Sequence, residues 1–546
     1  SSVPIGAEIV HPCSLDGPLG QPEGACVLQT DLRRIMLMLK RKAVHPSAEK
    51  RVPVVTSRNN RHSTMLVWAI LLALPLLVTG CAVEPEPEEF EPNLVHALKY
   101  QIKEDIPMAQ ASADANWVVT TMFGTPDDPR LPEVVLEDDE LSQVVSMDHL
   151  IRASGPEDAE GRGLYRLLCA SCHGVTGNGR GPVGAAQVPY PRDYRMGIFK
   201  FKSTPRGAKP TKADLKRLIK HGIAGTNMTS VDELLDLEKL KRSQMNVDWL
   251  PEKITDEDVD ALVDYVIYLS WRGEHERTQI DIGILEGVLD GETRLINADY
   301  GLKIGWQDRE SRDEWDSQID SLSEKDTDSL GETEQQELEK AERFEDDWGY
   351  AEEYAVDIGE SWLEAEDRVI EVPDPPSDLP VAESYADAQE ILEGDQASAF
   401  EASVKRGQEL FVGKVAACSK CHGAKGLGDG QTTDFDDWTK DWTTRVGLKP
   451  EDYDSLVPLL ARGAMPPLNA MPRNFAEGVF RGGSSSKDLY LRITQGIDGS
   501  PMPAATFVEG EFEKDDIWHL INFIRSLQTE EAPADEAPAE SDEKQA

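Results

Sequence analysis

The chain has 546 residues, more than one hydrophobic core ordinarily serves, so two or more domains are expected. It carries 101 acidic and 56 basic residues, and its formal net charge of −45 argues against nucleic acid as a partner of the whole chain. Beyond solubility, this acidity assigns no function, which has to be sought in local motifs.

The first element in chain order is an apolar run from Leu66 to Val78. It is shorter than the about 20 apolar residues that a membrane span needs, and it fits the core of a signal peptide. The sequence Val-Thr-Gly-Cys at 78–81 resembles a bacterial lipobox, in which Cys81 becomes the lipid anchor after cleavage. An uncleaved anchor helix is the alternative. Both interpretations tether the protein and place the rest outside the cytoplasm.

The N-terminal segments are divided accordingly. Residues 1–64 are interpreted as an upstream segment that is not part of the mature protein, and 65–81 as the signal/lipobox or anchor. Residues 82–155 are interpreted as a tether and N-terminal extension, because a Pro/Glu-rich stretch follows Cys81 and suits a domain that stands off a membrane.

Four of the seven cysteines lie in two motifs, CASCH at 169–173 and CSKCH at 418–422. Cys-x-x-Cys-His is the attachment pattern of c-type haem. Two thiols at this spacing reach the two vinyl groups on one side of a porphyrin, and the next histidine is then held under the iron. The motifs predict two haem c groups, with four thioether cysteines and two iron-ligating histidines: Cys169, Cys172, Cys418, Cys421, His173 and His422.

Two other uses of the cysteines were weighed. The pairs could form one Cys₄ zinc site, but they stand 249 positions apart (418 − 169), lie in separate repeats, and each carries its own histidine. A thioredoxin-like redox pair would need a βαβ context, which the sequence does not indicate.

The motifs belong to a longer repeat. Four glycines after the first histidine recur at the same spacing after the second, at 174, 177, 179, 181 and at 423, 426, 428, 430. PRDYRMGIFK (191–200) matches PRNFAEGVFR (472–481), and DLKRLIKHGIAGTNM (214–228) matches DLYLRITQGIDGSPM (488–502) without a gap. Each unit closes with apolar residues at helical spacing, and Thr255 and Asp258 predict a capping-box start for the first closing helix.

Each unit resembles a class I-type cytochrome c domain, over roughly 156–272 and 400–528. The resemblance implies an all-α fold around one covalent haem and a loop that brings a second iron ligand, namely Met228 and Met502. A thioether is a soft, neutral ligand that raises the reduction potential. The alternative is that these methionines fill the core; nearby rivals as ligands are Met196, Met245, Met465 and Met471.

The two methionine loops differ in their flanks. Met502 lies between Pro501 and Pro503, which fix the backbone, whereas Met228 lies between Asn227 and Thr229. If one haem has a labile or substituted sixth ligand, the sequence predicts that it is the first.

The remaining segments complete a mainly α fold of two cytochrome c-like helical domains joined by a long, acidic, partly helical linker, residues 273–399. Its four tryptophans predict helices that lie against the haem domains, such as Glu332 to Trp348. The second unit has an insertion at about 431–471, part of which looks helical. Residues 529–546 are interpreted as a disordered acidic tail.

One stretch opposes the general acidity, since residues 191–221 carry ten Lys or Arg against two Asp. Either the chain's own acidic linker neutralises this stretch, or it docks an acidic redox partner. Arg192 and Arg473, which occupy matched positions, are candidates to pair with haem propionates.

The sequence predicts an electron carrier in a respiratory chain, or the cytochrome subunit of a membrane complex, on the periplasmic side of a bacterial membrane. Its partners would be a donor complex and a terminal oxidase or other acceptor. The alternative is an enzyme such as a dihaem peroxidase, which needs an open iron site and often has a distal histidine. The candidate histidines do not occupy repeated loop positions: His96, His149, His221 and His519.

Overall fold

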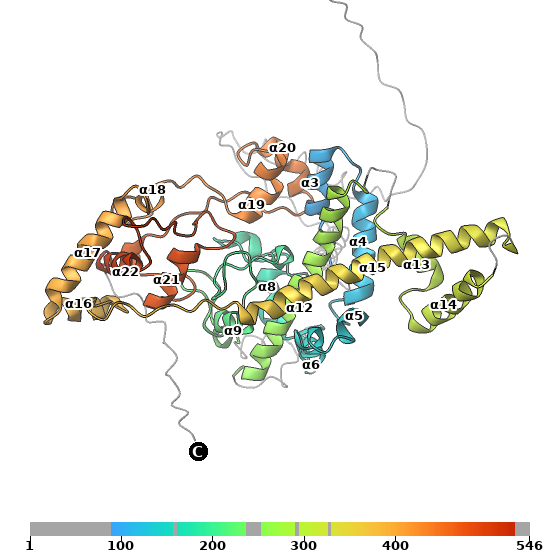
Figure 1. Cartoon of the computed structure of the whole chain (residues 1–546), viewed down its shortest axis with the longest axis horizontal. Helices are drawn as coiled ribbons and strands as arrows, with labels where there is room; N and C mark the ends of the chain where they lie inside the picture. Colours follow the sequence, from blue (N-terminus) through green and yellow to red (C-terminus); the bar gives the residue numbers. More distant parts are fainter. Residues whose placement is uncertain (1–88, 157–160, 236–252, 290–293, 326–328, 530–546) are drawn as a thin grey trace, which may run out of the picture. The chain divides into compact units, whose positions relative to one another are not determined.

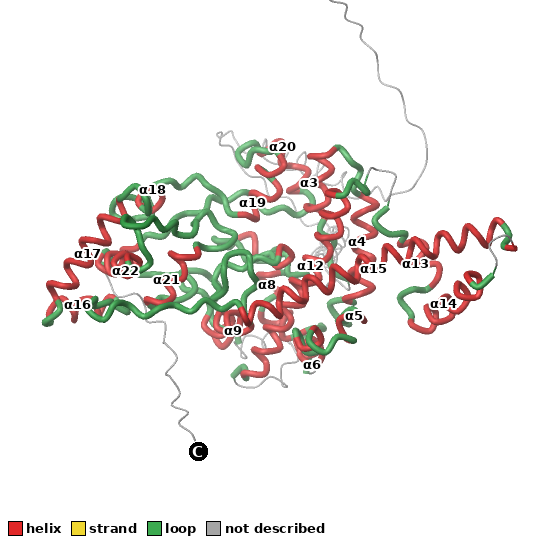
Figure 2. The backbone as a smooth tube through the Cα atoms, viewed as in Figure 1, coloured by secondary structure: helices red, strands yellow, loops and turns green. Residues whose placement is uncertain are grey.

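The computed structural model describes residues 89–156, 161–235, 253–289, 294–325 and 329–529. Every described residue belongs to one compact unit, within residues 85–546. The described residues form helices and loops, with isolated β-bridges but no strands (Figure 2), which confirms the predicted mainly α class. Cys81, the apolar run before it, Met245 and residues 530–546 lie outside the described residues.

The first attachment motif lies among short helices that precede one long helix. The short elements are α7 (Leu164–Leu168), α8 (Ala170–His173), η2 (Gly184–Ala186), η3 (Tyr194–Met196), α9 (Lys212–His221) and α10 (Val231–Leu234). The long closing helix is α12 (Asp256–Leu285). The predicted capping box at Thr255 and Asp258 is confirmed, and Thr211 and Asp214 form a second one that starts α9.

The second motif repeats this order. Its elements are α17 (Ala397–Val412), α18 (Ser419–His422), η6 (Phe475–Glu477), α21 (Ser486–Gln495) and α22 (Asp516–Ser526). Helices α17 and α22 cross at Gly407, where an added Cβ would lie 2.0 Å from the carbonyl oxygen of His519. Within the insertion lie α19 (Asp437–Trp442), η5 (Thr444–Val446) and α20 (Tyr453–Leu460).

Helices of the N-terminal extension and of the linker pack around α12 (Figure 1). The extension forms α3 (Leu94–Glu104), α4 (Ala109–Phe123), α5 (Glu133–Leu136), η1 (Leu141–Gln143) and α6 (Met147–Ala153). The linker forms α13 (Ala298–Ile304), α14 (Arg309–Ser323), α15 (Glu332–Asp367) and α16 (Tyr385–Glu393). Because α12 continues to Leu285, the expected boundary at 272 falls inside this helix.

The predicted helix at Glu332 starts as expected and runs on to Asp367. Its tryptophans enter the core: Trp348 lies against Trp117 and Trp306, with ring centroids 6.0 and 5.5 Å apart. Trp271 of α12 donates to the carbonyl of Ala355 at 2.8 Å. The linker helix α15 is therefore packed against the first repeated domain, whereas α16 packs on α17 of the second.

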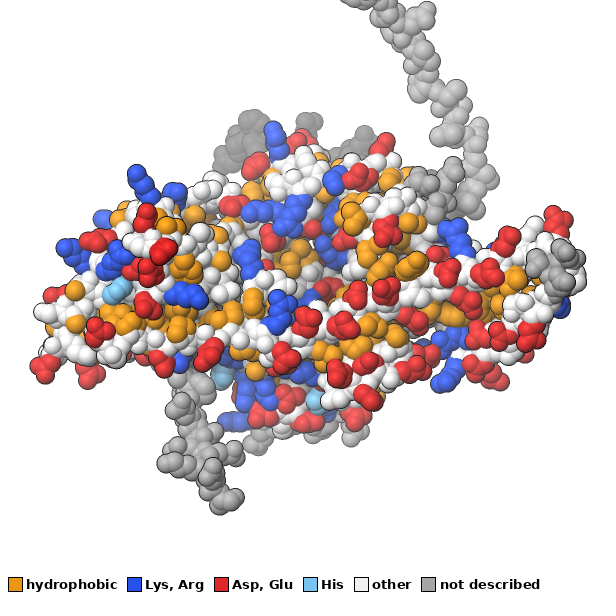
Figure 3. All heavy atoms as spheres, viewed as in Figure 1, with side chains coloured by type: hydrophobic (Ala, Val, Ile, Leu, Met, Phe, Trp, Pro, Cys, Tyr) orange, Lys and Arg blue, Asp and Glu red, His pale blue; other side chains and the backbone are white. Residues whose placement is uncertain are grey.

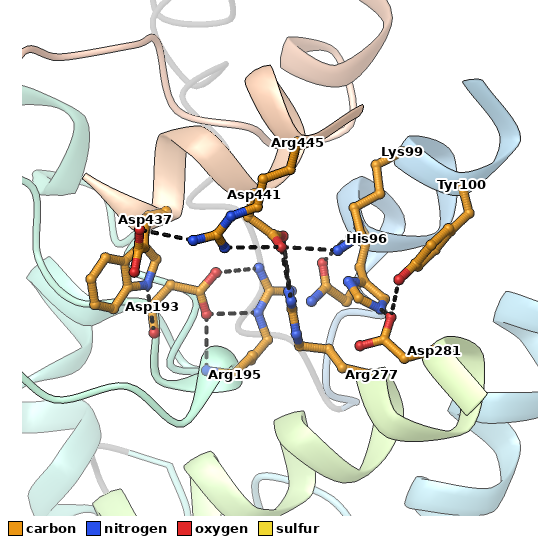
Figure 4. Close-up of polar contacts among 12 residues, drawn as sticks. His96, Lys99, Tyr100, Asp193, Arg195, Arg277, Asp281, Asp437, Asp441 and Arg445 are labelled. Atoms are coloured by element: carbon orange, nitrogen blue, oxygen red, sulfur yellow. Dashed lines mark hydrogen bonds and ion pairs between the residues drawn. The ribbon is translucent and has the colours of Figure 1, made fainter. Parts of the chain in front are cut away.

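A buried polar cluster ties α3 to α12 and to α19 of the insertion (Figure 4). His96 Nε2 lies 2.8 Å from Asp281 Oδ1, and the Tyr100 hydroxyl donates to the same oxygen at 2.6 Å. Lys99 and Arg277 pair with Asp441 of α19, at 3.0 and 3.3 Å. The N-terminal extension thus contacts both repeated domains, through α12 of the first and α19 of the second.

Asp and Glu side chains crowd the exposed faces of α14 and α15 (Figure 3). Among the described residues, no helix is both long and apolar enough to cross a membrane.

Candidate functional site

Each Cys-x-x-Cys-His motif forms a single helical turn. The carbonyl of Cys169 accepts from the amides of Cys172 and His173 at 3.1 and 2.9 Å, and Cys418 repeats both bonds at 3.2 and 2.9 Å. All four thiols are free of disulfides. Burial raises the pKa of Cys169 to about 12 and that of Cys418 to about 11. A thioredoxin-like pair needs a thiol with a lowered pKa, so the thioether assignment fits this environment better.

Each motif histidine is oriented by one backbone hydrogen bond. His173 Nδ1 donates to the carbonyl of Arg192 at 3.2 Å, and His422 Nδ1 donates to that of Arg473 at 3.1 Å. This arrangement leaves Nε2 as the nitrogen for a metal. Burial lowers the pKa of His173 to about 4, which keeps the imidazole neutral, as a ligand has to be.

An aromatic ring lies flat against each histidine. Tyr194 stacks on His173 with centroids 4.9 Å apart, and Phe475 stacks on His422 at 4.5 Å. A further aromatic ring continues each stack, and it is a phenylalanine in both domains: Phe199 in the first and Phe480 in the second. These rings restrict the rotation of the imidazoles, so the proximal side is built alike in both units.

The repeated glycines allow the following loop to wrap closely around the motif. Gly179 and Gly428 have φ of 74° and 73°, and an added Cβ would lie 2.6 Å from the carbonyl of Pro191 and of Pro472, respectively. An L-residue would be strained there and would also displace backbone. The backbone angle and the close approach are the same at both positions, so the two glycines have the same structural role in the two domains.

The two methionine loops have the same backbone hydrogen bonds. Ile223 donates to the carbonyl of Met228 at 2.7 Å, and Ile497 donates to that of Met502 at 3.1 Å. Inside each loop, the hydroxyl of Thr226 or of Ser500 accepts from the methionine amide, at 3.1 and 3.3 Å. Both methionines are half-buried. Their assignment as iron ligands stays a prediction.

Two half-buried guanidinium groups near the second motif fit an anionic group, in addition to Glu477, which lies 3.2 Å from Arg473 Nη2. Arg473 Nη1 and Arg481 Nε are buried without a hydrogen-bond partner. Burial and the neighbouring Arg473 lower the pKa of Arg481, and burial lowers that of Arg192 to about 10. Cations in such surroundings call for an anion, and the propionates of a haem would supply it. The residues present therefore fit a covalently attached haem.

The family model of cytochrome c matches two segments of the chain, residues 159–270 and 404–528. The chain therefore contains two cytochrome c-like helical domains. Each matched segment includes one attachment motif and one methionine loop, which supports a dihaem c-type cytochrome.

Among solved structures, the chain resembles one from the reducing HAO-like protein complex of Kuenenia stuttgartiensis, at 18% identity. The match covers 72% of this chain and 97% of that chain, with a TM-score of 0.32, which is too low to support a shared function. A comparison with curated proteins gives no match.

Candidate distal histidines are engaged elsewhere or lie at the surface. His149 contacts Asp264 and Glu257 at 2.7 and 3.1 Å, and His519 Nδ1 lies 2.8 Å from Ser403 Oγ. His96 belongs to the polar cluster with Asp281, and His221 is exposed. In the part of the chain that the structure describes, no three metal-ligating side chains gather, as a zinc site would need.

The rival methionines differ in exposure. Met471 is 63% exposed, whereas Met196 and Met465 are half-buried and line a cavity beside Arg192. Met465 and Met471 lie in the insertion that only the second domain has, and Met196 lies in a repeated stretch where the second domain has Glu477 instead.

The basic stretch 191–221 is compensated within the chain. All of its cations except Arg192 and Arg206 form ion pairs with carboxylates of the chain itself. Most of the partners lie on α12 or in the second domain, whereas one of the two alternatives placed them in the acidic linker. The reason is proximity: α9 packs on α12, which presents Asp256, Asp260 and Asp264.

The contacts between the two cytochrome c domains were not anticipated from the sequence. Trp438 of the insertion lies over the Arg192 guanidinium, 3.2 Å from ring centroid to Cζ, and donates to the carbonyl of Asp193 at 3.1 Å. No local pattern marks Trp438, because its partners are more than 200 positions away. The one indication of a role was that Trp438 lies in an insertion that only the second repeat contains.

Proposed function

We propose that the chain transfers electrons through two c-type haems outside the cytoplasm. It would act as a carrier or as the cytochrome subunit of a membrane complex. The observation that carries this proposal is the equivalence of the two sites: a Cys-x-x-Cys-His turn, a histidine oriented by a backbone carbonyl, and a methionine loop closed by the same bonds. Two equally closed sites suit electron transfer better than substrate binding.

When bound, each haem supplies a one-electron couple at its iron. The residues of the chain hold and orient it. The cysteines would attach it covalently, the carbonyls of Arg192 and Arg473 fix the histidine rings, and the loops would supply Met228 and Met502 as further iron ligands. Rigid hydrogen-bonded ligands keep the reorganisation on electron transfer small. No side chain is assigned as acid, base or nucleophile.

The alternative function, a dihaem peroxidase, requires one iron with an open or exchangeable position. That iron would be the one near the Met228 loop, because Asn227 and Thr229 stand where prolines flank Met502. Low-temperature EPR and magnetic circular dichroism of the ferric holoprotein distinguish the functions. Two low-spin His/Met signals support the carrier, and a high-spin ferric signal would instead support the enzyme.

The proposal includes attachment to the periplasmic face of a bacterial membrane through Cys81, and redox partners consisting of a donor complex and a terminal oxidase or other acceptor. The lipobox-like sequence at 78–81 supports the attachment. The Cys81→Ser variant should lose incorporation of labelled fatty acid and appear in the soluble fraction. Label retained in this variant would refute lipidation at Cys81.

A further inference from the structure

The methionine loop of the second domain is held by residues of the first. Lys202 Nζ lies 2.8 Å from Asp498 Oδ2, and the amide of Gly207 donates to the same oxygen at 2.8 Å. The side chains of Lys202 and Asp498 are only 4% and 11% exposed. A buried carboxylate with two donors fixes the loop far more firmly than a surface pair does.

A third donor reaches the neck of the same loop. Arg206 Nη1 donates to the carbonyl of Ile497 at 3.2 Å and to that of Met502 at 3.3 Å. The Met502 carbonyl also accepts from the Ile497 amide, which closes the loop. Lys202, Arg206 and the Gly207 amide therefore form a clamp, and this name is kept for them below.

The clamp is anchored in the first domain. The amide and hydroxyl of Ser203 donate to Asp214 Oδ2 at 2.8 and 2.9 Å, and the Thr204 hydroxyl donates to the carbonyl of Lys209 at 2.6 Å. Ile370, where the linker leaves α15, donates to the carbonyl of Ser203 at 2.9 Å. The clamp thus has a rigid base outside the loop that it holds.

The methionine loop of the first domain lacks this arrangement. Position 224, which matches Asp498, is alanine and offers no carboxylate. From the second domain, Arg481 Nη2 donates to the Gly225 carbonyl at 3.2 Å, and Gly225 faces Val479. The methionine loop of the second domain therefore depends on the first domain more than the methionine loop of the first domain depends on the second.

We propose that the clamp is a positioning device for the distal ligand of the second haem, so that ligation by Met502 depends on docking of the two domains. The Met228 loop relies mainly on its own domain. This inference rests on the proposed function, because it assumes that Met502 ligates iron. It implies that any event that separates the domains lowers the potential of the second haem selectively.

The test compares full-length holoprotein variants. Asp498→Ala installs the residue that the first loop carries at this position, so the loop conformation itself tolerates it. Lys202→Met removes the charge and Lys202→Arg retains it. The control Lys216→Ala removes a lysine of the same stretch whose partner, Asp260, lies within the first domain.

In Asp498→Ala and Lys202→Met, we expect amide exchange at Ile497 to rise at least about tenfold, since the bond it makes is no longer braced. The Fe(III)–thioether charge-transfer band should fall by about half, from loss at the second haem alone, and Lys202→Arg should restore it. Lys216→Ala should leave both measurements at the wild-type value.

Unchanged exchange and an unchanged band in Asp498→Ala and Lys202→Met would overturn the proposal. Loss of both haem signals would overturn it too, because the effect would not be specific to one domain. Absence of a thioether band in the wild type would instead refute the proposed ligation, while the exchange measurement still tests the clamp.

Discussion

The histidine of each attachment motif is oriented by one backbone carbonyl and by a stacked aromatic ring. Arg192 and Arg473 supply that carbonyl and also a half-buried guanidinium, so each residue has two roles at its site. The carbonyl fixes the tautomer with Nδ1 protonated, and the guanidinium suits a propionate. Any substitution at these arginines therefore has to be separated into side-chain and backbone effects.

Replacement of Met502 or Met228 by alanine should lower the potential of one haem and leave the other nearly unchanged. We expect a fall of roughly 0.2 V, a fraction of the ~0.8 V range that axial ligands span. A redox titration that resolves the two haems measures it. A fall in neither potential would exclude these methionines as ligands.

Gly428→Ala and Gly447→Ala separate backbone strain from steric overlap. Both residues have positive φ, 73° and 85°, but only at Gly428 does an added Cβ approach backbone, 2.6 Å from the Pro472 carbonyl. Gly447→Ala should cost about 1 kcal/mol of unfolding free energy, and Gly428→Ala at least ~2 kcal/mol, because backbone has to move. Amide exchange in α22 measures both; equal costs would contradict the steric argument.

Among the elements, those carried by the repeat were predictable from the sequence. The matched stretches 214–228 and 488–502 predicted a helix followed by a methionine loop, and both appear with the same caps and loop bonds. Because the sequence contains two copies of the repeat, the residues common to both copies could be identified, which one copy alone would not allow. The start of α15 at Glu332 was also predicted correctly.

The elements that connect the repeats were less predictable. The extension of α12 to Leu285 brings Trp271 and His275 against α15, but local spacing does not indicate which helix receives them. The partners of the basic stretch were also left open by the sequence. One alternative named the acidic linker as the source of carboxylates, whereas most of the carboxylates that pair with it lie on α12 or in the second domain.

The polar cluster between α3, α12 and α19 makes the packing of these elements depend on pH (Figure 4). Burial, together with Arg277, lowers the pKa of His96 to about 4. Burial alone would raise the pKa of Asp281, but the bonds from His96 and Tyr100 hold it at about 2. Asp441 faces the same cluster, and Arg277 and Lys99 hold its pKa below the usual range despite burial.

His96→Gln should remove part of this dependence. A histidine with a folded pKa of about 4 binds fewer protons than the unfolded chain between pH 6.5 and 4, so its stabilisation is lost as pH falls through that window. The wild type should lose on the order of 2 kcal/mol more than the variant between pH 6.5 and 4.5. Urea unfolding followed by tryptophan fluorescence measures the difference.

Because the glutamine amide can still donate to Asp281, the two proteins should be similar at pH 7. His275, which burial also shifts to a pKa of about 4, contributes equally to both and cancels in the comparison. The same loss in both proteins would show that His96 does not titrate as described.

At the scale of the whole described molecule, the two largest hydrophobic cores are unequal in extent, and three smaller clusters lie beside them. The larger core joins the N-terminal extension, the first cytochrome c domain and the linker helices α13–α15. The smaller core is confined to the second cytochrome c domain, with a few residues from the end of the linker packed against it. Most of the extension and the linker helices α13–α15 thus share the core of the first domain, whereas α3 also packs on the insertion, α16 packs on α17, and the second domain has a core of its own.

Trp348→Ala should therefore destabilise the first core selectively. Trp348 is 7% exposed and lies between Trp117 and Trp306, so its loss should cost about 3–5 kcal/mol of unfolding free energy. Tyr350→Ala is the control, because this side chain of the same helix is 59% exposed and should matter by less than about 0.5 kcal/mol. Hydrogen exchange resolved by peptide should show α12 losing protection while α17 and α22 keep theirs, since α17 and α22 pack on each other in the second core. Equal loss of protection in α22 would mean that the two cores unfold as one cooperative unit, and that the clamp between the domains transmits stability as well as position.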